Sequence, residues 1–185
     1  MAKITFILGG VRSGKSAFAE QLAVDSGLPK IYLATAEAGD AEISQRITAH
    51  RNRRGDGWQT IEEPIDIVNI ITSACHPAFI AGSVEVPRPR DKHGVTILVD
   101  CLTLWLSNLL HYNHDIEQKT EELIEALKAT KNNIILVSSE VGQGVIPDNA
   151  LARQFVDAAG ILHQKIASVA DEVFFVTAGI SQKLK

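Results

Sequence analysis

The sequence has few of the residues that mark disulfide-rich or metal-binding proteins. It contains two cysteines among 185 residues, Cys75 and Cys101, and they are not spaced as a C-x-x-C pair. We therefore expect no disulfide framework and interpret both as small buried hydrophobic residues. Four of the six histidines, at positions 76, 93, 111 and 114, show no ligand spacing with cysteines or carboxylates. A structural metal site is not expected.

Charge of one sign and long hydrophobic runs are also lacking. Lysine plus arginine number 18 and aspartate plus glutamate 22, a formal net charge of −4, which argues against a dedicated nucleic-acid-binding protein. No run approaches 18 uninterrupted apolar residues, so no membrane span is expected. The apolar run at residues 4–8 is too short for a signal peptide. The sequence predicts a cytoplasmic protein.

What is present is an ordinary globular composition, 45% hydrophobic and 22% charged. The length predicts one domain over residues 1–185, able to bury about 70% of its unfolded surface. No internal repeat stands out. Residues 76–94 show no periodicity and contain Pro77, Pro87 and Pro89, so we expect a surface loop there.

Short apolar runs alternate with amphipathic stretches along the chain. We expect strands at residues 4–8, 31–35, 95–99, 134–138 and 173–177. We expect helices at about 15–26, 40–54, 65–74, 102–112, 117–130 and 151–169, the last with an apolar stripe that starts at Leu151 and includes Phe155 and Ala159. Unbroken apolar strands separated by helices are typical of a parallel sheet covered on both faces. The pattern predicts a three-layer α/β fold.

A phosphate-binding loop follows the first expected strand. Residues 9–16 match G-x-x-x-x-G-K-[ST] between a strand and a helix, as the mechanism of a P-loop requires. The loop consists of Gly9, Gly10, Val11, Arg12, Ser13, Gly14, Lys15 and Ser16. Its backbone N–H groups and the helix N-terminus attract phosphates. We expect Lys15 to reach the β- and γ-phosphates and Ser16 to ligate Mg²⁺.

An acidic residue ends the third expected strand. Asp100 follows the apolar run at 95–99, and in P-loop proteins a carboxylate at such a place holds the Mg²⁺ shell, partly through water. The alternative is that Asp100 only caps the next helix. The P-loop predicts a nucleoside triphosphate ligand but does not separate a kinase from an ATPase, a switch or a nucleotidyltransferase.

The expected helix at 40–54 carries a histidine among arginines. Arg46 and Arg54 stand four residues either side of His50, and flanking cations favour a neutral imidazole, the form that a nucleophile needs. The same arginines could hold triphosphate oxygens. However, Ile43 and Ile47 precede His50 at helical spacing, so His50 could instead complete an apolar stripe.

Glu62 belongs to a short segment, residues 58–64, that holds a tryptophan and two carboxylates. A carboxylate here could accept hydrogen bonds from a guanine or from a ribose hydroxyl. It could equally pair with Arg51 or Arg53. The spacing does not choose between these roles.

Taken together, the motifs resemble those of the bifunctional adenosylcobinamide kinase / adenosylcobinamide-phosphate guanylyltransferase family. The resemblance covers the chain nearly end to end, except residues 76–94. It rests on residues 8–16 with Ala19 and Glu20, 32–36, Glu42, Arg46, Ile47, His50, Arg51, Arg54, 58–64, 99–105 with 107–109, 139–147, Arg153, Phe155, Asp157, Gly160, Gln164, 170–173 and 178–180.

The resemblance implies a P-loop NTPase fold of the RecA-like kind and two reactions. ATP or GTP phosphorylates adenosylcobinamide; GMP then passes from GTP through a guanylylated histidine to adenosylcobinamide phosphate, which gives adenosylcobinamide-GDP and pyrophosphate. His50 would be that histidine. Nucleotide would be bound by the P-loop and by Ala34, Thr35, Ala36, Arg51, Asn52, Arg53, Arg54, Glu62 and Asp100. The family resemblance also suggests a homotrimer.

Three features depart from the pattern expected of this family. Ser139 and His163 stand where asparagine is common, and the segment at 76–94 is longer than usual. We interpret His163 as a helix-surface residue and Trp105 as a core or subunit contact. Two other functions remain open. A simple P-loop kinase of a small metabolite would need no histidine nucleophile, and a nucleotide-binding switch would bind nucleotide without consuming it.

Overall fold

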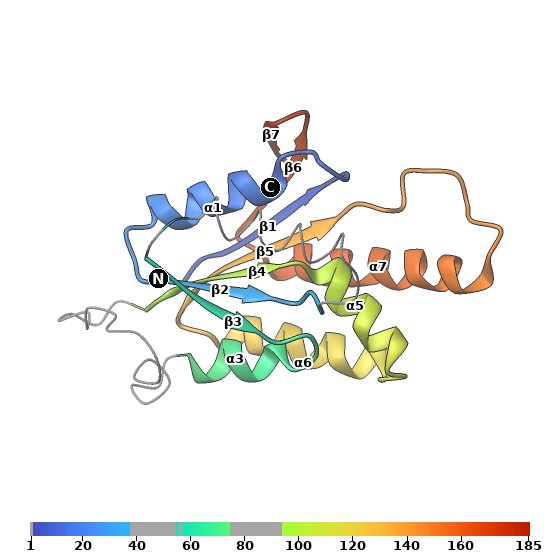
Figure 1. Ribbon diagram of the computed structural model, residues 1–185, viewed down its shortest axis with the longest axis horizontal. Coiled ribbons are helices and arrows are strands. Elements are labelled where there is room, and N and C mark those ends of the chain that lie inside the picture. Colours follow the sequence, from blue (N-terminus) through green and yellow to red (C-terminus); the bar gives the residue numbers. More distant parts are fainter. Residues whose placement is uncertain (1, 38–54, 56, 75–93) are drawn as a thin grey trace.

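The computed structural model describes residues 2–37, 55, 57–74 and 94–185. The helix expected at 40–54 and most of the loop expected at 76–94 lie outside the described residues. Within the described part, a seven-stranded sheet forms the centre of the molecule (Figure 1). No helix in that part is long and apolar enough to cross a membrane.

The strands run parallel except at one edge. The sheet comprises β1 (Ile4–Gly9), β2 (Lys30–Ala34), β3 (Trp58–Glu62), β4 (Thr96–Asp100), β5 (Asn133–Ser139), β6 (Glu172–Thr177) and β7 (Ile180–Lys183). Their order is β3-β2-β4-β5-β1-β6-β7, and only β6 and β7 pair antiparallel. Because β5 lies between β1 and β4, the strand before the P-loop and the strand before Asp100 are not neighbours.

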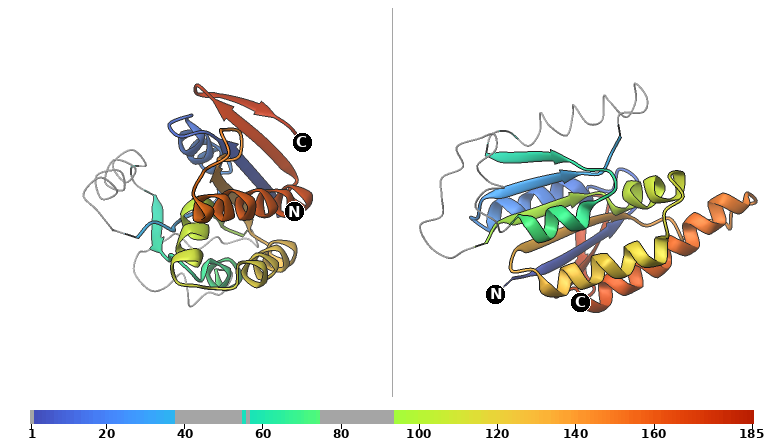
Figure 2. Two further views of the ribbon diagram at one scale, coloured as in Figure 1. Left: turned by 90° about the vertical axis from the view of Figure 1, so that its right-hand side faces the viewer. Right: turned by 90° about the horizontal axis from the view of Figure 1, so that it is seen from below.

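Helices cover both faces of the sheet (Figure 2). They are α1 (Lys15–Asp25), α3 (Ile67–Ser73), α5 (Leu102–His111), α6 (Ile116–Ala129) and α7 (Ala150–Val169). Among the described helices, α1 packs on one face and the other four on the opposite face. The expected α/β architecture with a mostly parallel central sheet is confirmed.

Burial on both faces explains the unbroken apolar strands. In β1, Phe6 faces the cluster made with the four helices, whereas its neighbour Ile7 faces the cluster made with α1. In β4, Val99 likewise faces the cluster made with the four helices, and Leu98 faces the cluster made with α1. Successive side chains of a strand point to opposite faces, so both must be apolar when both faces are covered.

Two strands escaped the sequence analysis, β3 and β7. Both are edge strands with polar sequences, WQTIE and ISQK, and β7 is exposed along its whole length. An edge strand is covered on fewer sides than a central one, so it need not be apolar. The search for apolar runs therefore could not find either strand.

Helix α7 differs from expectation at two positions. Leu151, expected in the stripe, is 63% exposed, because the first turns of α7 extend beyond the sheet (Figure 2). His163, expected on the helix surface, is instead buried at 8% exposure. It follows Ala159 by four residues and precedes Ile166 by three, so it lies on the inward face.

Candidate functional site

The P-loop joins the end of β1 to the start of α1. Gly14 occupies the N-cap position of α1 with φ of 97°, a left-handed conformation that would be strained for any residue with a side chain. Lys15 folds back so that its Nζ donates to the Gly10 carbonyl oxygen at 2.9 Å. Partial burial lowers the pKa of Lys15, an effect that the nearby Asp100 opposes. The ammonium thus sits where the loop encloses it.

The turn between β6 and β7 packs against the P-loop. The Gly179 N–H donates to the Ser13 carbonyl oxygen at 2.8 Å. A Cβ at Gly14 would come within 3.1 Å of the Gly179 Cα, and a Cβ at Gly9 within 2.4 Å of the Val176 carbonyl oxygen. Gly9 and Gly14 are therefore required by close backbone approach as well as by loop curvature. The sequence analysis assigned no role to this turn.

Three of the expected site residues share one row at the carboxyl edge of the sheet. Glu62 pairs in register with Ala34, and Ala34 pairs with Asp100. The Tyr32 hydroxyl donates to Asp100 Oδ2 at 3.1 Å. Cys101, not Asp100, occupies the N-cap of α5, and that cap has no side-chain hydrogen bond. The geometry of Asp100 thus differs from that of a capping residue.

Thr35 links the second strand to the fourth. Its hydroxyl donates to the Cys101 carbonyl oxygen at 2.7 Å and accepts from the Cys101 N–H at 2.9 Å. These bonds fix the loop after β2 against the end of β4. Cys101, expected to be a buried hydrophobic residue, packs against the core but is only partly buried. Its burial raises the pKa of the thiol to about 11, and Asp100 adds to the rise, so Cys101 stays protonated near neutral pH.

Asn108 of α5 holds two of the site loops together. Its Nδ2 donates to the Thr35 carbonyl oxygen at 2.8 Å and to the Pro64 carbonyl oxygen at 3.1 Å. The loop after β2 and the loop after β3 therefore depend on one side chain. Asn108 belongs to the motif at 107–109 on which the family resemblance rests. The sequence does not reveal its role, because both of its partners are backbone atoms far away in the chain.

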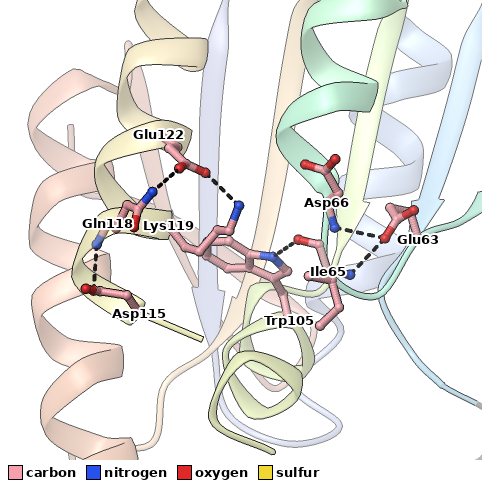
Figure 3. A network of polar contacts seen from close by, with 8 residues as sticks. All are labelled: Glu63, Ile65, Asp66, Trp105, Asp115, Gln118, Lys119 and Glu122. Atoms are coloured by element: carbon pink, nitrogen blue, oxygen red, sulfur yellow. Dashed lines mark hydrogen bonds and ion pairs between the residues drawn. The ribbon is translucent and has the colours of Figure 1, made fainter. Parts of the chain in front are cut away.

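A polar network fixes the loop that follows Glu62 (Figure 3). Glu63 Oε1 accepts from the N–H groups of Ile65 and Asp66 at 3.0 and 2.8 Å, and Trp105 Nε1 donates to the Ile65 carbonyl oxygen at 2.8 Å. Trp105 is fully buried and packs in the core, which agrees with the interpretation of Trp105 as a core residue. Glu63 therefore has a structural role in this loop.

The remaining expected site residues lie outside the described part of the chain. They are His50, Arg51, Asn52, Arg53 and Arg54. Among the described residues, no group of three histidine, cysteine, aspartate or glutamate side chains could hold a metal. A P-loop Mg²⁺ needs fewer protein ligands than that. A serine hydroxyl and a carboxylate, as at Ser16 and Asp100, are the oxygen donors that this ion uses beside nucleotide phosphates.

Comparisons with known proteins place the chain in a family. The sequence model described as "Cobinamide kinase / cobinamide phosphate guanyltransferase" matches residues 5–184. The chain is 44% identical to the bifunctional adenosylcobalamin biosynthesis protein CobP of Pseudomonas aeruginosa, over 97% of this chain and 95% of that protein. It is 32% identical to CobU of Escherichia coli, which has the same description, over 97% and 98%.

The chain belongs to the cobinamide kinase / cobinamide phosphate guanyltransferase family. The resemblance inferred from the motifs is thereby confirmed, and with it the expectation of an enzyme of this bifunctional kind. The match nevertheless covers nearly the whole chain, residues 76–94 included in its span.

Solved structures that resemble this one share only its fold. The flagellar accessory protein FlaH from Methanocaldococcus jannaschii has a TM-score of 0.50 at 14% identity, over 99% of this chain and 78% of that chain. A prototypical ATPase from the type III secretion system of pathogenic bacteria has a TM-score of 0.52 at 12% identity, over 98% and 56%. The P-loop NTPase fold expected from the sequence is confirmed.

Proposed function

We propose that this enzyme phosphorylates adenosylcobinamide with ATP or GTP and then transfers GMP from GTP, through guanylylated His50, to adenosylcobinamide phosphate. The products are adenosylcobinamide-GDP and pyrophosphate. The observation that carries the proposal is the convergence of the P-loop, Asp100 and Glu62 on one edge of the sheet, in a chain of this family. Ligands of open parallel sheets bind at that edge.

The phosphates would lie on the P-loop. Its backbone N–H groups and the N-terminus of α1 attract the anionic groups. Lys15 is already held over the loop by Gly10 and needs only to exchange that carbonyl oxygen for phosphate oxygens. Its charge would offset the charge that grows on a departing pyrophosphate.

Ser16 and Asp100 would hold Mg²⁺, Asp100 partly through water. Bound there, the ion would neutralise and orient the β- and γ-phosphate oxygens. The hydrogen bond from Tyr32 keeps the Asp100 carboxylate in place at the end of β4. Thr35 braces the same strand end through Cys101.

Glu62 would bind the nucleoside end of GTP. It stands four strands from the P-loop strand, about 19 Å away at the usual spacing of about 4.8 Å per strand. This separation is too large for a contact with the P-loop phosphates. Recognition of guanine or ribose therefore fits its position better than phosphate binding, and residues 34–36 would lie between the two ends.

His50 would attack the α-phosphorus of GTP as a neutral imidazole. The N–P bond forms, the bond to the pyrophosphate oxygen breaks, and pyrophosphate leaves. The phosphoramidate then passes GMP to the cobinamide phosphate. Residues 51–54 would contact the triphosphate beside it. Splitting the transfer into two steps suits histidine, which attacks well when neutral and leaves well when protonated.

Covalent labelling tests this function. With GTP labelled at the α-phosphate and Mg²⁺, we expect label on the wild-type protein in a denaturing gel, lost in acid and absent from His50→Ala. His111, an exposed histidine of α5, supplies the matched control, since His111→Ala should keep the label. A wild-type protein that takes no label under turnover conditions would exclude the histidine intermediate and favour the simple kinase.

We further propose a cytoplasmic homotrimer without a nucleic-acid partner. The family resemblance supports the trimer. Three exposed apolar side chains near the start of α7, Val145, Ile146 and Leu151, supply a surface that association would bury.

A further inference from the structure

A cavity of about 560 Å³ opens beside the P-loop. Its walls come from the P-loop, from the loop after β5 and from the end of β6; they include Arg12, Glu140, Gln143 and Thr177. Among these lining residues, all of them described, Glu140 is the one carboxylate and Arg12 the one cation. The two reactions proposed above use no residue of the loop after β5.

Glu140 is held in place from two directions. Its backbone N–H donates to the Gly9 carbonyl oxygen at 3.0 Å, which ties it to the first residue of the P-loop. Its Oε1 accepts from the Gly142 N–H at 2.6 Å. The other carboxylate oxygen, Oε2, lies 3.8 Å from His163 Nδ1. The carboxylate therefore has a fixed position at the cavity wall.

A chain of polar groups leads from the sheet to that carboxylate. The Ser139 N–H donates to Thr103 Oγ1 at 2.6 Å, Thr103 Oγ1 lies 3.1 Å from Ser138 Oγ, and Ser138 Oγ lies 2.8 Å from His163 Nε2. One assignment of protons satisfies every member. Thr103 donates to Ser138, Ser138 donates to Nε2, and the imidazole proton then resides on Nδ1, facing Glu140.

The surroundings keep this imidazole neutral. Burial lowers the pKa of His163, and the Glu140 carboxylate opposes the effect only in part. Phe6 packs against the ring with a centroid distance of 5.6 Å. The distance of 3.8 Å is too long for a direct hydrogen bond, but a neutral ring with its proton on Nδ1 presents the positive end of its N–H dipole to the Glu140 carboxylate without neutralising its charge.

We propose that Glu140 is the general base of the kinase reaction and that His163 positions it. This inference rests on the proposed function. The hydroxyl oxygen of cobinamide attacks the γ-phosphorus, a new O–P bond forms and the bond to the β-phosphate oxygen breaks. The hydroxyl proton passes to the Glu140 carboxylate, and ADP or GDP leaves. The cavity that Glu140 shares with the P-loop is the place where an acceptor hydroxyl can meet both.

The chemistry of the two half-reactions provides a selective test. Kinase transfer removes a proton from a hydroxyl, whereas guanylyl transfer to a phosphate has no such proton to remove. Glu140→Gln keeps the shape and the Gly142 hydrogen bond but is not a base. We expect it to lower kcat of adenosylcobinamide phosphorylation about 10²–10⁴-fold while α-labelled GTP still labels the protein.

The controls separate this inference from the proposed function. Glu121 lies on α6 and forms an exposed ion pair with Lys165 of α7, so Glu121→Gln should leave both half-reactions unchanged. If the wild type neither phosphorylates adenosylcobinamide nor takes the label, the proposed function fails. If the wild type does both and Glu140→Gln phosphorylates normally, or loses both activities equally, the assignment of Glu140 is overturned.

The positioning role of His163 is tested by replacements that keep or remove its donor. Asparagine can place an amide N–H near the position of Nδ1, whereas leucine cannot. We expect His163→Leu to lower kcat of phosphorylation at least tenfold with little change in KM for ATP, and His163→Asn to restore most of it. Equal activity of the two variants, at matched thermal stability, would contradict the role.

Discussion

Gly9, the last residue of β1, illustrates how little space the P-loop leaves at the level of single atoms. The position of its absent Cβ is 2.4 Å from the Val176 carbonyl oxygen and 2.6 Å from Ser13 Oγ. The first of these is a backbone atom of β6, which pairs with β1 in the sheet, and it cannot move aside cheaply. The need for glycine here comes from packing as well as from phosphate binding.

We expect Gly9→Ala to lower the free energy of unfolding by about 1–3 kcal/mol, because the added methyl group overpacks this contact. Urea unfolding measures the effect. Gly10→Ala is the matched control: nothing lies within 4 Å of its Cβ position, so its stability should be unchanged or slightly raised. Equal losses in the two variants would show that the contact with Val176 does not decide stability.

At the scale of elements, α5 holds together the loops that follow β2 and β3. Asn108 reaches the loops after β2 and β3, and Trp105, one turn earlier, reaches the Ile65 carbonyl oxygen. One helix therefore sets the relative positions of Thr35 and Glu62. If Glu62 binds the nucleoside as proposed, Asn108 would contribute to binding only by positioning these loops.

We expect Asn108→Ala to lose two hydrogen bonds, each worth about 0.5–1.5 kcal/mol, and to raise KM for GTP more than it lowers the rate of labelling. Steady-state kinetics and urea unfolding measure the two effects. Ser107, exposed on the same helix, supplies the control Ser107→Ala. An unchanged KM in Asn108→Ala would mean that the two loops keep their positions without it.

At the scale of the whole molecule, the sheet brings the two ends of the chain together. β1 lies between β5 and β6, so the P-loop is supported on both sides by strands more than 120 residues later in the sequence. We propose on this basis that residues 1–185 fold as one domain. The contacts of the P-loop with Val176 and Gly179 are present only when the last third of the chain has joined the sheet.

The proposed trimer predicts a mass three times that of the 20.1-kDa chain in sedimentation equilibrium. Ile146→Asp puts a charge into the exposed apolar surface near α7 and should shift the protein towards monomer. Val24→Asp, at an exposed apolar residue of α1, should not. A wild-type protein of monomer mass would exclude the trimer.

The sequence by itself determined the central strands, most of the helices, the P-loop and the family. These depend on local patterns: apolar runs for strands buried on both faces, and fixed spacing for a loop that binds phosphate through its backbone. It also marked Asp100, because a polar residue at the end of an apolar run stands out, and Glu62, because the segment at 58–64 belongs to the family pattern. Whether these residues act as proposed stays a prediction.

Only the tertiary structure decided the rest. The polar edge strands β3 and β7 lack a local signal, since pairing with a neighbour stabilises them more than burial does. The orientation of His163 towards Ser138 and Glu140 depends on how α7 packs against the sheet. The roles of Asn108 and Gly179 depend on backbone atoms that are distant in sequence. Such contacts form only when the sheet is assembled, so no local pattern can encode them.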